Sequence, residues 1–162
     1  MNLRSVTLLA AVLLVAACAE DQTNKNATTG TGGGAGGQTT STAQPGSEQD
    51  LVQNVGDRVF FDYDKSEIKP EGRQVLQRQA DWLKKYSNVT VTVEGHCDER
   101  GTREYNLALG ERRATAVKKL LAALGVAPNR VSTISYGKER PAVPGSTEAA
   151  WAQNRRGVTV VN

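Results

Sequence analysis

Residues 19–50 contain no Val, Ile, Leu, Phe, Tyr or Trp, and this gap decides which parts of the chain can fold together. The segment is mainly Gly, Thr, Ser, Gln and Ala, which bury too little apolar surface to offset the entropy lost on folding. We predict a flexible tether, with a root-mean-square span of roughly 30 Å and a stretched limit of roughly 110 Å. A compact fold is expected in residues 51–162, which have the size of one domain.

Residues 1–17 have the three parts of a secretory signal. Arg4 and the amino terminus supply positive charge, an apolar run follows, and two alanines precede the expected cleavage point. The apolar run is too short to cross a bilayer, which takes about 20 helical residues. Cleavage would leave Cys18 as the first residue of the mature chain.

The cleavage point lies in a run that resembles the lipobox of bacterial lipoproteins, Leu14-Val15-Ala16-Ala17-Cys18. That resemblance implies a diacylglycerol thioether on the sulfur of Cys18 and a fatty acyl group on the new amino terminus. The alternative is an ordinary signal peptide that ends near a cysteine. The chain has two cysteines, so if Cys18 carries lipid, Cys97 has no disulfide partner. Cys97 is then expected to be a buried thiol.

The pattern after residue 51 alternates between strands and helices. Period-two alternation predicts strands, and apolar residues at helical spacing predict helices. Strands are expected over 58–62, 89–94, 130–136 and 157–161, and helices over about 70–86, 102–124 and 148–152. Helices of this length between strands favour crossovers that pack on one sheet. The predicted fold is a two-layer α/β sandwich with a mixed sheet, in the order βαβαβ, short helix, final strand.

The predicted domain is more basic than the whole chain. The chain has 20 basic and 17 acidic residues, and two of the basic and four of the acidic ones precede residue 51. That leaves 18 and 13, a net charge of about +5. The excess suggests an anionic partner, and a solvated basic surface is the alternative. Nucleic acid is not the expected partner, because a secreted, lipid-anchored chain does not meet it.

The chain's only histidine stands next to a cysteine, so this pair is tested first for catalysis or metal binding. His96 and Cys97 end a strand, where successive side chains point to opposite faces, so they cannot easily form a dyad. One His and one free Cys are too few for zinc. Asp62, Asp64 and Asp98 lack the spacing of a calcium-binding loop. We therefore expect no enzyme activity, metal or cofactor.

Charged residues of both signs flank the turn between the second predicted strand and the second predicted helix. Asp98 follows the strand, Gly101 permits a sharp turn and Thr102 can cap the helix. Asn106 and Arg113 share one face of that helix. Arginine grips a carboxylate with two hydrogen bonds and aspartate binds an ammonium, so Asp98 and Arg113 suit a zwitterion such as a free amino-acid centre. The alternative is a plain Asp98–Arg113 salt bridge.

Six short runs stand out along residues 55–162: FDYDKS from Phe61, GHCDERGT from Gly95, YNLALG from Tyr105, RRA from Arg112, SYG from Ser135 and NRR from Asn154. In order and with few gaps, they resemble the peptidoglycan-associated lipoproteins. That group belongs to the family that shares the carboxyl-terminal domain of outer-membrane protein A. The resemblance implies a periplasmic domain that binds the peptide stem of peptidoglycan without cutting it. Gly157, where the family more usually has alanine or valine, is a small departure.

The resemblance also implies a ligand and its contacts. The recognised unit in this family is meso-diaminopimelate, whose side-chain end carries an ammonium and a carboxylate. The family's key aspartate falls on Asp98 and its key arginine on Arg113. Its supporting contacts fall on Asp64, Asn106 and Arg155.

Partners and location follow from the same resemblance. These lipoproteins act in the Tol system, which links outer membrane, wall and inner membrane and supports envelope integrity and constriction at cell division. The implied protein partner is the periplasmic propeller protein of that system, TolB, bound over a surface that overlaps the wall-binding face. Ala19, which follows the lipidated cysteine in place of an aspartate, favours the outer membrane. Two functions remain open: a wall-binding anchor, and a protein-interaction adaptor with incidental wall affinity.

Overall fold

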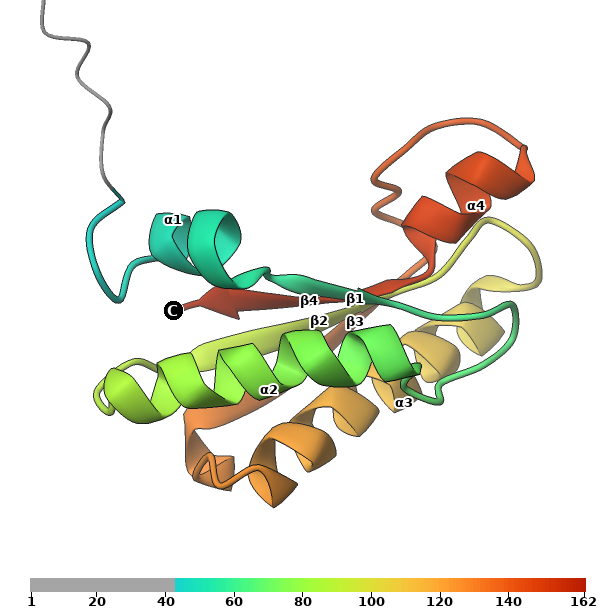
Figure 1. Ribbon diagram of the computed structural model, residues 1–162. Coiled ribbons are helices and arrows are strands. Elements are labelled where there is room, and N and C mark those ends of the chain that lie inside the picture. The colour runs from blue at the N-terminus through green and yellow to red at the C-terminus, as the bar shows by residue number, and fades with distance from the viewer. Residues whose placement is uncertain (1–42) are drawn as a thin grey trace, which may run out of the picture. The chain divides into compact units, whose positions relative to one another are not determined.

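In the computed structural model, which describes residues 43–162, a four-stranded sheet carries two long helices on one face (Figure 1). The strands are β1 (Arg58–Phe60), β2 (Val91–His96), β3 (Val131–Gly137) and β4 (Arg156–Val161). The helices are α1 (Glu48–Asp50), α2 (Pro70–Lys85), α3 (Arg103–Ala123) and α4 (Glu148–Asn154). A π-helical turn, η1, follows α1 at Leu51–Val55, and a 3₁₀ turn, η2, precedes β3 at Pro128–Arg130.

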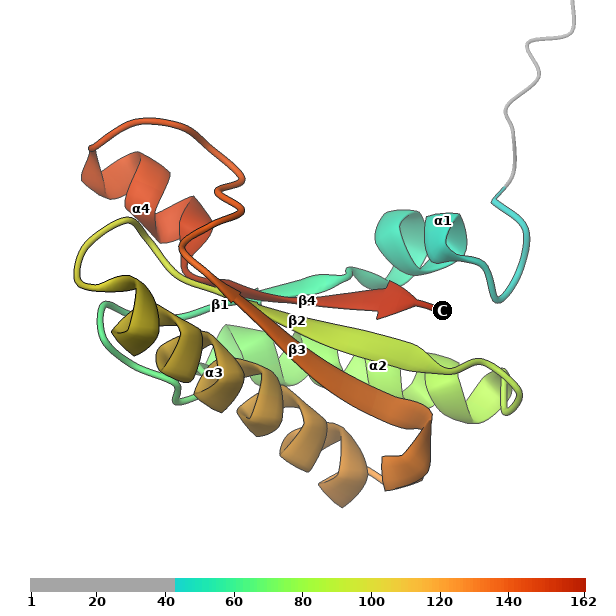
Figure 2. The ribbon, with the colours of Figure 1, turned by 180° about the vertical axis from the view of Figure 1, so that it is seen from behind.

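The strand order in the sheet is β1-β4-β2-β3. β2 and β3 are parallel neighbours joined by α3, with Val91 opposite Val131. β4 lies antiparallel between β1 and β2, with Val59 opposite Gly157. The prediction of a mixed sheet in a two-layer sandwich is confirmed, because the final strand inserts against the direction of the other three. Figure 2 shows β3 at the sheet edge with α3 running along it.

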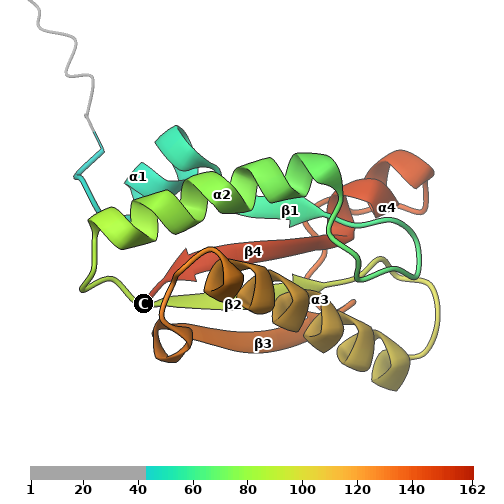
Figure 3. The ribbon, with the colours of Figure 1, turned by 60° about the horizontal axis from the view of Figure 1, so that its bottom comes forward.

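The core lies between the sheet and the helices α2 and α3, which cover the same face (Figure 3). Apolar residues three and four apart on each helix form a stripe that faces the sheet. The fully buried side chains of this core include Leu76, Ala80 and Leu83 of α2, Val91 and Val93 of β2, and Ala114, Val117 and Leu121 of α3. The helix α4 lies on the opposite face, at one end of the sheet (Figures 1 and 2). The short helix α1 lies at the other end, where Glu48 contacts Val161 of β4 and Asp50 contacts Trp82 of α2.

Two glycines let α3 pack directly on β2. A Cβ atom at Gly95 would lie 1.8 Å from the carbonyl oxygen of Gly110, and a Cβ atom at Gly110 would lie 2.2 Å from Oγ of Ser135. No side chain fits at either position, so backbone meets backbone. This contact fixes the first turns of α3 against the end of β2, where the predicted ligand contacts lie.

The folded unit begins before the predicted boundary at residue 51, which is a correction. Oγ of Ser47 caps α1 by accepting from the backbone N–H of Asp50 at 3.2 Å. The Asp50 carboxylate accepts from Nε1 of Trp82 at 2.9 Å, and Glu48 accepts from the backbone N–H of Val161 at 2.6 Å. Residues 43–50, assigned above to the tether, therefore belong to the domain. Polar contacts attach these residues to the domain, so an apolar pattern in the sequence does not reveal that they belong to it.

The remaining predictions for the amino-terminal part of the chain concern residues outside those that the structure describes. They are the signal over 1–17, the lipidated Cys18 and the tether up to residue 42. Within residues 43–162, none of the helices combines the length and the apolar character that a bilayer crossing requires.

Candidate ligand-binding site

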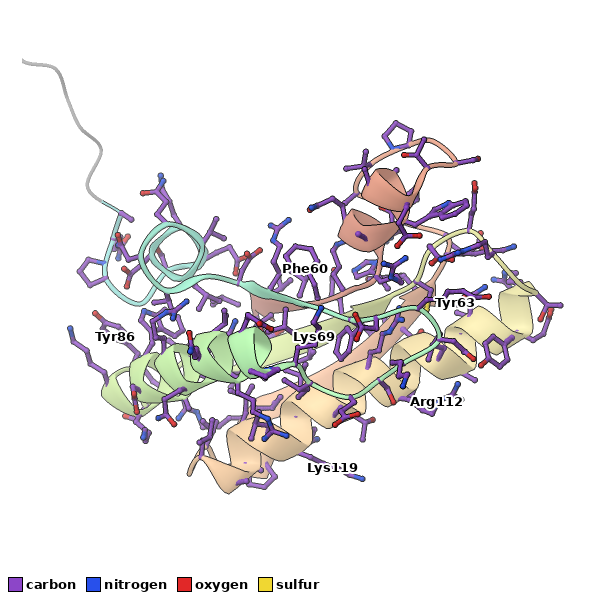
Figure 4. The ribbon with its side chains drawn as sticks, turned by 45° about the vertical axis from the view of Figure 1, so that its right-hand side comes forward. Phe60, Tyr63, Lys69, Tyr86, Arg112 and Lys119 are labelled. Carbon is purple, nitrogen blue, oxygen red and sulfur yellow. The ribbon has the colours of Figure 1, made fainter. Side chains whose placement is uncertain are left out.

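A pocket of about 230 Å³ opens where the carboxyl end of β2 meets the amino end of α3. The loop between β1 and α2 closes one side, and Figure 4 shows Tyr63 of this loop beside α3. The lining residues are Tyr63, Asp64, Cys97, Asp98, Arg100, Gly101, Tyr105, Asn106, Leu109 and Arg113. Four of the five predicted ligand contacts therefore share one pocket, and Arg155 is the one that does not line it.

The turn between β2 and α3 is built by three residues of the segment that follows Asp98. Gly101 has φ +89°, a left-handed conformation that favours glycine. Oγ1 of Thr102 accepts from the backbone N–H of Tyr105 at 3.2 Å and so caps α3 as predicted. Nδ2 of Asn106 donates to the carbonyl oxygens of Arg100 at 2.8 Å and Thr102 at 2.9 Å. Asn106 thus holds the turn in shape, which is a positioning task.

Asp98 is 4% exposed, and each of its carboxylate oxygens has two donors. Oδ1 accepts from the backbone N–H and from Nε of Arg100, both at 3.1 Å. Oδ2 accepts from a terminal nitrogen of Arg100 at 2.6 Å and from one of Arg155 at 3.4 Å. Burial opposes ionisation, but the hydrogen bonds from Arg100 outweigh it and hold the pKa of Asp98 below its usual value.

Arg113 is a buried residue at the pocket wall and donates to three backbone carbonyls. Its Nε reaches Lys65 at 2.8 Å, and its terminal nitrogens reach His96 at 2.7 Å and Asp62 at 3.1 Å. The guanidinium therefore ties the β1–α2 loop to the end of β2. A guanidinium has five N–H bonds, so two remain, one on each terminal nitrogen. Burial lowers the pKa of Arg113, yet the side chain stays charged at any relevant pH.

The alternative of a plain Asp98–Arg113 salt bridge is not what the structure contains. In the part of the chain that the structure describes, the ion pairs of Asp98 are with Arg100 at 2.6 Å and Arg155 at 3.4 Å. Asp98 and Arg113 instead line the same pocket from separate hydrogen-bond networks. Two opposite charges that are not paired with each other can be bridged by a ligand carrying both.

Of the other two predicted contacts, Asp64 lines the pocket and Arg155 does not. Asp64 is an exposed residue with φ 57° and accepts from the hydroxyl of Tyr105, which raises the pKa of that phenol. Arg155 lies behind Asp98, with a side chain that is 8% exposed. Its Nε donates to the carbonyl oxygen of Phe61 at 3.1 Å, and a terminal nitrogen donates to Glu148 at 2.7 Å. Arg155 therefore positions Asp98 from behind.

Sequence reasoning missed the aromatic side chains of the site and the role of Arg100. The guanidinium carbon of Arg100 lies 4.0 Å from the ring centroid of Tyr63 and 4.0 Å from that of Trp151. Tyr105 lines the pocket and remains half exposed. Tyr63 stands in one of the quoted runs, so its place in the run could have marked it. Trp151, in α4, has no such signal.

His96 and Cys97 have separate surroundings, as the strand geometry predicts. His96 is 1% exposed and its Nε2 lies 3.3 Å from a Glu94 oxygen, while Nδ1 has no hydrogen-bond partner among residues 43–162. The thiol of Cys97 is buried and donates to the carbonyl oxygen of Asn106 at 3.4 Å, and burial raises its pKa. Within residues 43–162, no three His, Cys, Asp or Glu side chains gather closely enough to hold a metal ion.

Comparisons with known proteins agree with this architecture. Residues 60–155 match the model of the OmpA family. The chain is 50% identical to a peptidoglycan-associated lipoprotein of Agrobacterium fabrum over 157 residues, 97% of this chain and 86% of the relative. It is 57% identical to one of Brucella melitensis over 120 residues, 74% of this chain and 71% of the relative. The fold is similar to the crystal structure of the peptidoglycan-associated lipoprotein from Burkholderia pseudomallei, with a TM-score of 0.66, 39% identity and coverage of 70% of this chain and 100% of that one.

Proposed function

The chain belongs to the OmpA family, and from that premise we propose that it is an outer-membrane lipoprotein whose periplasmic domain binds the peptide stem of peptidoglycan. The observation that carries this proposal is a small pocket with a buried carboxylate, Asp98, and a buried guanidinium, Arg113, that are not paired with each other. Such a pocket fits a ligand that carries an ammonium and a carboxylate on one centre. The protein is not an enzyme, since domains of this family are structural and bind the wall.

The side-chain end of meso-diaminopimelate is such a centre. In the proposed complex, Asp98 accepts from the ammonium and the two remaining N–H bonds of Arg113 donate to the carboxylate. Charge-assisted hydrogen bonds of this kind contribute roughly 1.5–3 kcal/mol each. Asn106 and Arg155 keep the two charged groups in place, and Asp64 contributes from the rim.

The same proposal covers the anchor and the partners. Cys18 would carry the lipid, and two or more acyl chains give stable membrane attachment where one gives marginal binding. The domain would connect the outer membrane to the wall within the Tol–Pal system and exchange the wall for the propeller protein TolB. Support for this part is the lipobox resemblance and the similarity to proteins named peptidoglycan-associated lipoprotein.

Sedimentation with protein-free peptidoglycan sacculi tests the proposal. Asp98→Asn removes the charge that receives the ammonium at nearly constant volume, and we expect binding to weaken tenfold to a hundredfold or more, since 1.4 kcal/mol is a factor of ten. Asp81→Asn, an exposed change on α2, is the matched control and should bind as wild type does.

A second arm varies the ligand. Stem peptides with lysine in place of diaminopimelate lack the second carboxylate and should bind more weakly to the wild-type chain. The proposal is wrong if a folded Asp98→Asn variant binds sacculi with wild-type affinity. Wild-type protein that stays in the supernatant would favour the adaptor function instead.

A further inference from the structure

Arg100 binds the carboxylate of Asp98, which in the proposed function receives the ammonium of the ligand. Its Nε and one terminal nitrogen donate to the two oxygens of Asp98, at 3.1 and 2.6 Å. This is the two-point geometry with which a guanidinium binds a carboxylate ligand. Because the two residues are only two positions apart, the pair closes a short loop at a small entropic cost.

Two aromatic rings complete the binding place of this guanidinium. The rings of Tyr63 and Trp151 each have their centroid 4.0 Å from its central carbon. Tyr63 comes from the loop after β1 and Trp151 from α4, so both are far from Arg100 in sequence. A cation-binding site typically combines a carboxylate with aromatic rings whose faces contact the cation. Asp98, Tyr63 and Trp151 provide this combination. In the structure, that site holds a side chain of the protein itself.

Of the two arginines that bind Asp98, Arg100 is the more exposed and has fewer hydrogen-bond partners. Arg155 has a side chain only 8% exposed and also donates to Phe61 and Glu148, so it is fixed behind the carboxylate. The side chain of Arg100 is 29% exposed. Among the described residues, its guanidinium donates to Asp98 alone.

We propose that Arg100 is an internal competitor, a cation that fills the ammonium subsite of the empty pocket and must swing away when a ligand binds. The inference rests on the proposed function, because it takes Asp98 as the receiver of the ligand's ammonium. A site open for only a fraction of the time binds with an affinity reduced by that fraction. If Arg100 covers Asp98 in about 90–99% of molecules, it weakens binding about tenfold to a hundredfold. The competitor would also exclude weakly bound cations such as free amines.

The test is the affinity of the full chain, held in detergent micelles, for a soluble stem peptide that contains meso-diaminopimelate. Arg100→Gln cannot make the two-point contact, and we expect it to bind the peptide at least about tenfold more tightly. Arg103→Gln is the matched control, because it removes one exposed positive charge near the start of α3 whose ion pair is with Glu139. Arg103→Gln should show wild-type affinity. Equal or weaker binding by Arg100→Gln, relative to this control, would overturn the inference.

A spectroscopic measurement follows Arg100 directly. Its Nε–H resonance, assigned by its loss in Arg100→Gln, should show slow exchange with water in the free protein and faster exchange once the peptide is bound. Slow exchange that persists in the complex would mean that the guanidinium never leaves, which also contradicts the inference.

Asp98→Asn separates the two proposals. If the variant loses peptide binding while Arg100→Gln fails to tighten it, the proposed function stands and the competitor does not. If the variant keeps wild-type binding, the proposed function fails. In that case, faster exchange at Arg100 Nε–H in the free Asp98→Asn variant would still support the contact between the two side chains.

Discussion

Arg113 has a structural role beside the ligand contact that we propose for it. It donates to the carbonyl oxygens of Lys65, His96 and Asp62, so its removal would leave three buried acceptors without a partner. A variant of Arg113 that loses wall binding therefore cannot be assigned to ligand contact alone. A substitution of Asp98 tests the ligand contact with less disturbance of the fold, because its partners Arg100 and Arg155 retain other contacts.

His96 gives a pH dependence at the same scale. Burial, with the charges of Arg156 and Arg140 nearby, lowers the pKa of His96 from 6.5 to about 4, although Glu94 lies 3.3 Å from its Nε2. The unfolded chain thus takes up the proton at a higher pH than the folded one. His96 therefore does not lower the free energy of unfolding above about pH 6.5, and it lowers that free energy progressively as the pH falls toward 4. At about 1.4 kcal/mol per pH unit, the free energy of unfolding should drop by up to about 3 kcal/mol.

Urea denaturation of the full chain at pH 7 and pH 4.5 measures this drop. His96→Gln, which cannot take up a proton, should show a clearly smaller difference between the two pH values. The substitution changes only the side chain of residue 96. The backbone carbonyl oxygen of that residue, which accepts from Arg113, is retained. Equal pH dependence in variant and wild type would assign the loss to other groups.

At the scale of elements, the contact between β2 and α3 determines the shape of the pocket. Gly110→Ala should destabilise the domain, because its Cβ would lie 2.2 Å from Oγ of Ser135, even though alanine favours a helix by about 1 kcal/mol. Gly95→Ala should be worse, since its Cβ would meet the backbone carbonyl of Gly110 at 1.8 Å. Thermal unfolding of the single variants should rank them in that order.

Ser135→Ala gives this prediction its control. It removes the oxygen that Gly110→Ala would strike, so the double variant should be less unstable than the sum of the two single changes. Ser135→Ala should not rescue Gly95→Ala, because that clash is with backbone. If Ser135→Ala does not rescue Gly110→Ala, the contact with Oγ is not the main cost of that change. If it rescues Gly95→Ala as well, its effect is not specific to that contact.

The sequence predicts the elements of this fold well where apolar residues carry the pattern. The stripe from Ala114 to Leu121 and the valines of β2 are buried as expected, and the strand–turn–helix order correctly brings Asp98 and Arg113 to one pocket. The contact between Asp98 and Arg100 was not predictable in this way. It depends on a side-chain rotamer that stacks against Tyr63 and Trp151, which come from distant parts of the chain.

At the scale of the whole molecule, the early start of the domain matters for stability. Asp50 accepts from Nε1 of Trp82, and Gly46 and Asn54 donate to the same carboxylate. A chain that begins at Leu51 loses these contacts and exposes part of α2. We expect it to unfold at a lower temperature than a chain that begins at Ala43, in a scanning calorimeter at one concentration. Identical midpoints would mean that residues 43–50 add nothing to the fold.

The position of that early segment has a mechanical consequence. Glu48 contacts Val161 at the far end of β4, while Arg155, just before the start of β4, contacts Asp98 of the pocket. A pull between membrane and wall would therefore enter at one end of the sheet and leave at the other (Figure 1). The hydrogen bonds of an antiparallel pair lie across the strands, so such a load is shared by many bonds at once. Under the proposed function, tension between membrane and wall would therefore load the sheet in shear, the direction in which a sheet resists rupture, and would not peel it open strand by strand.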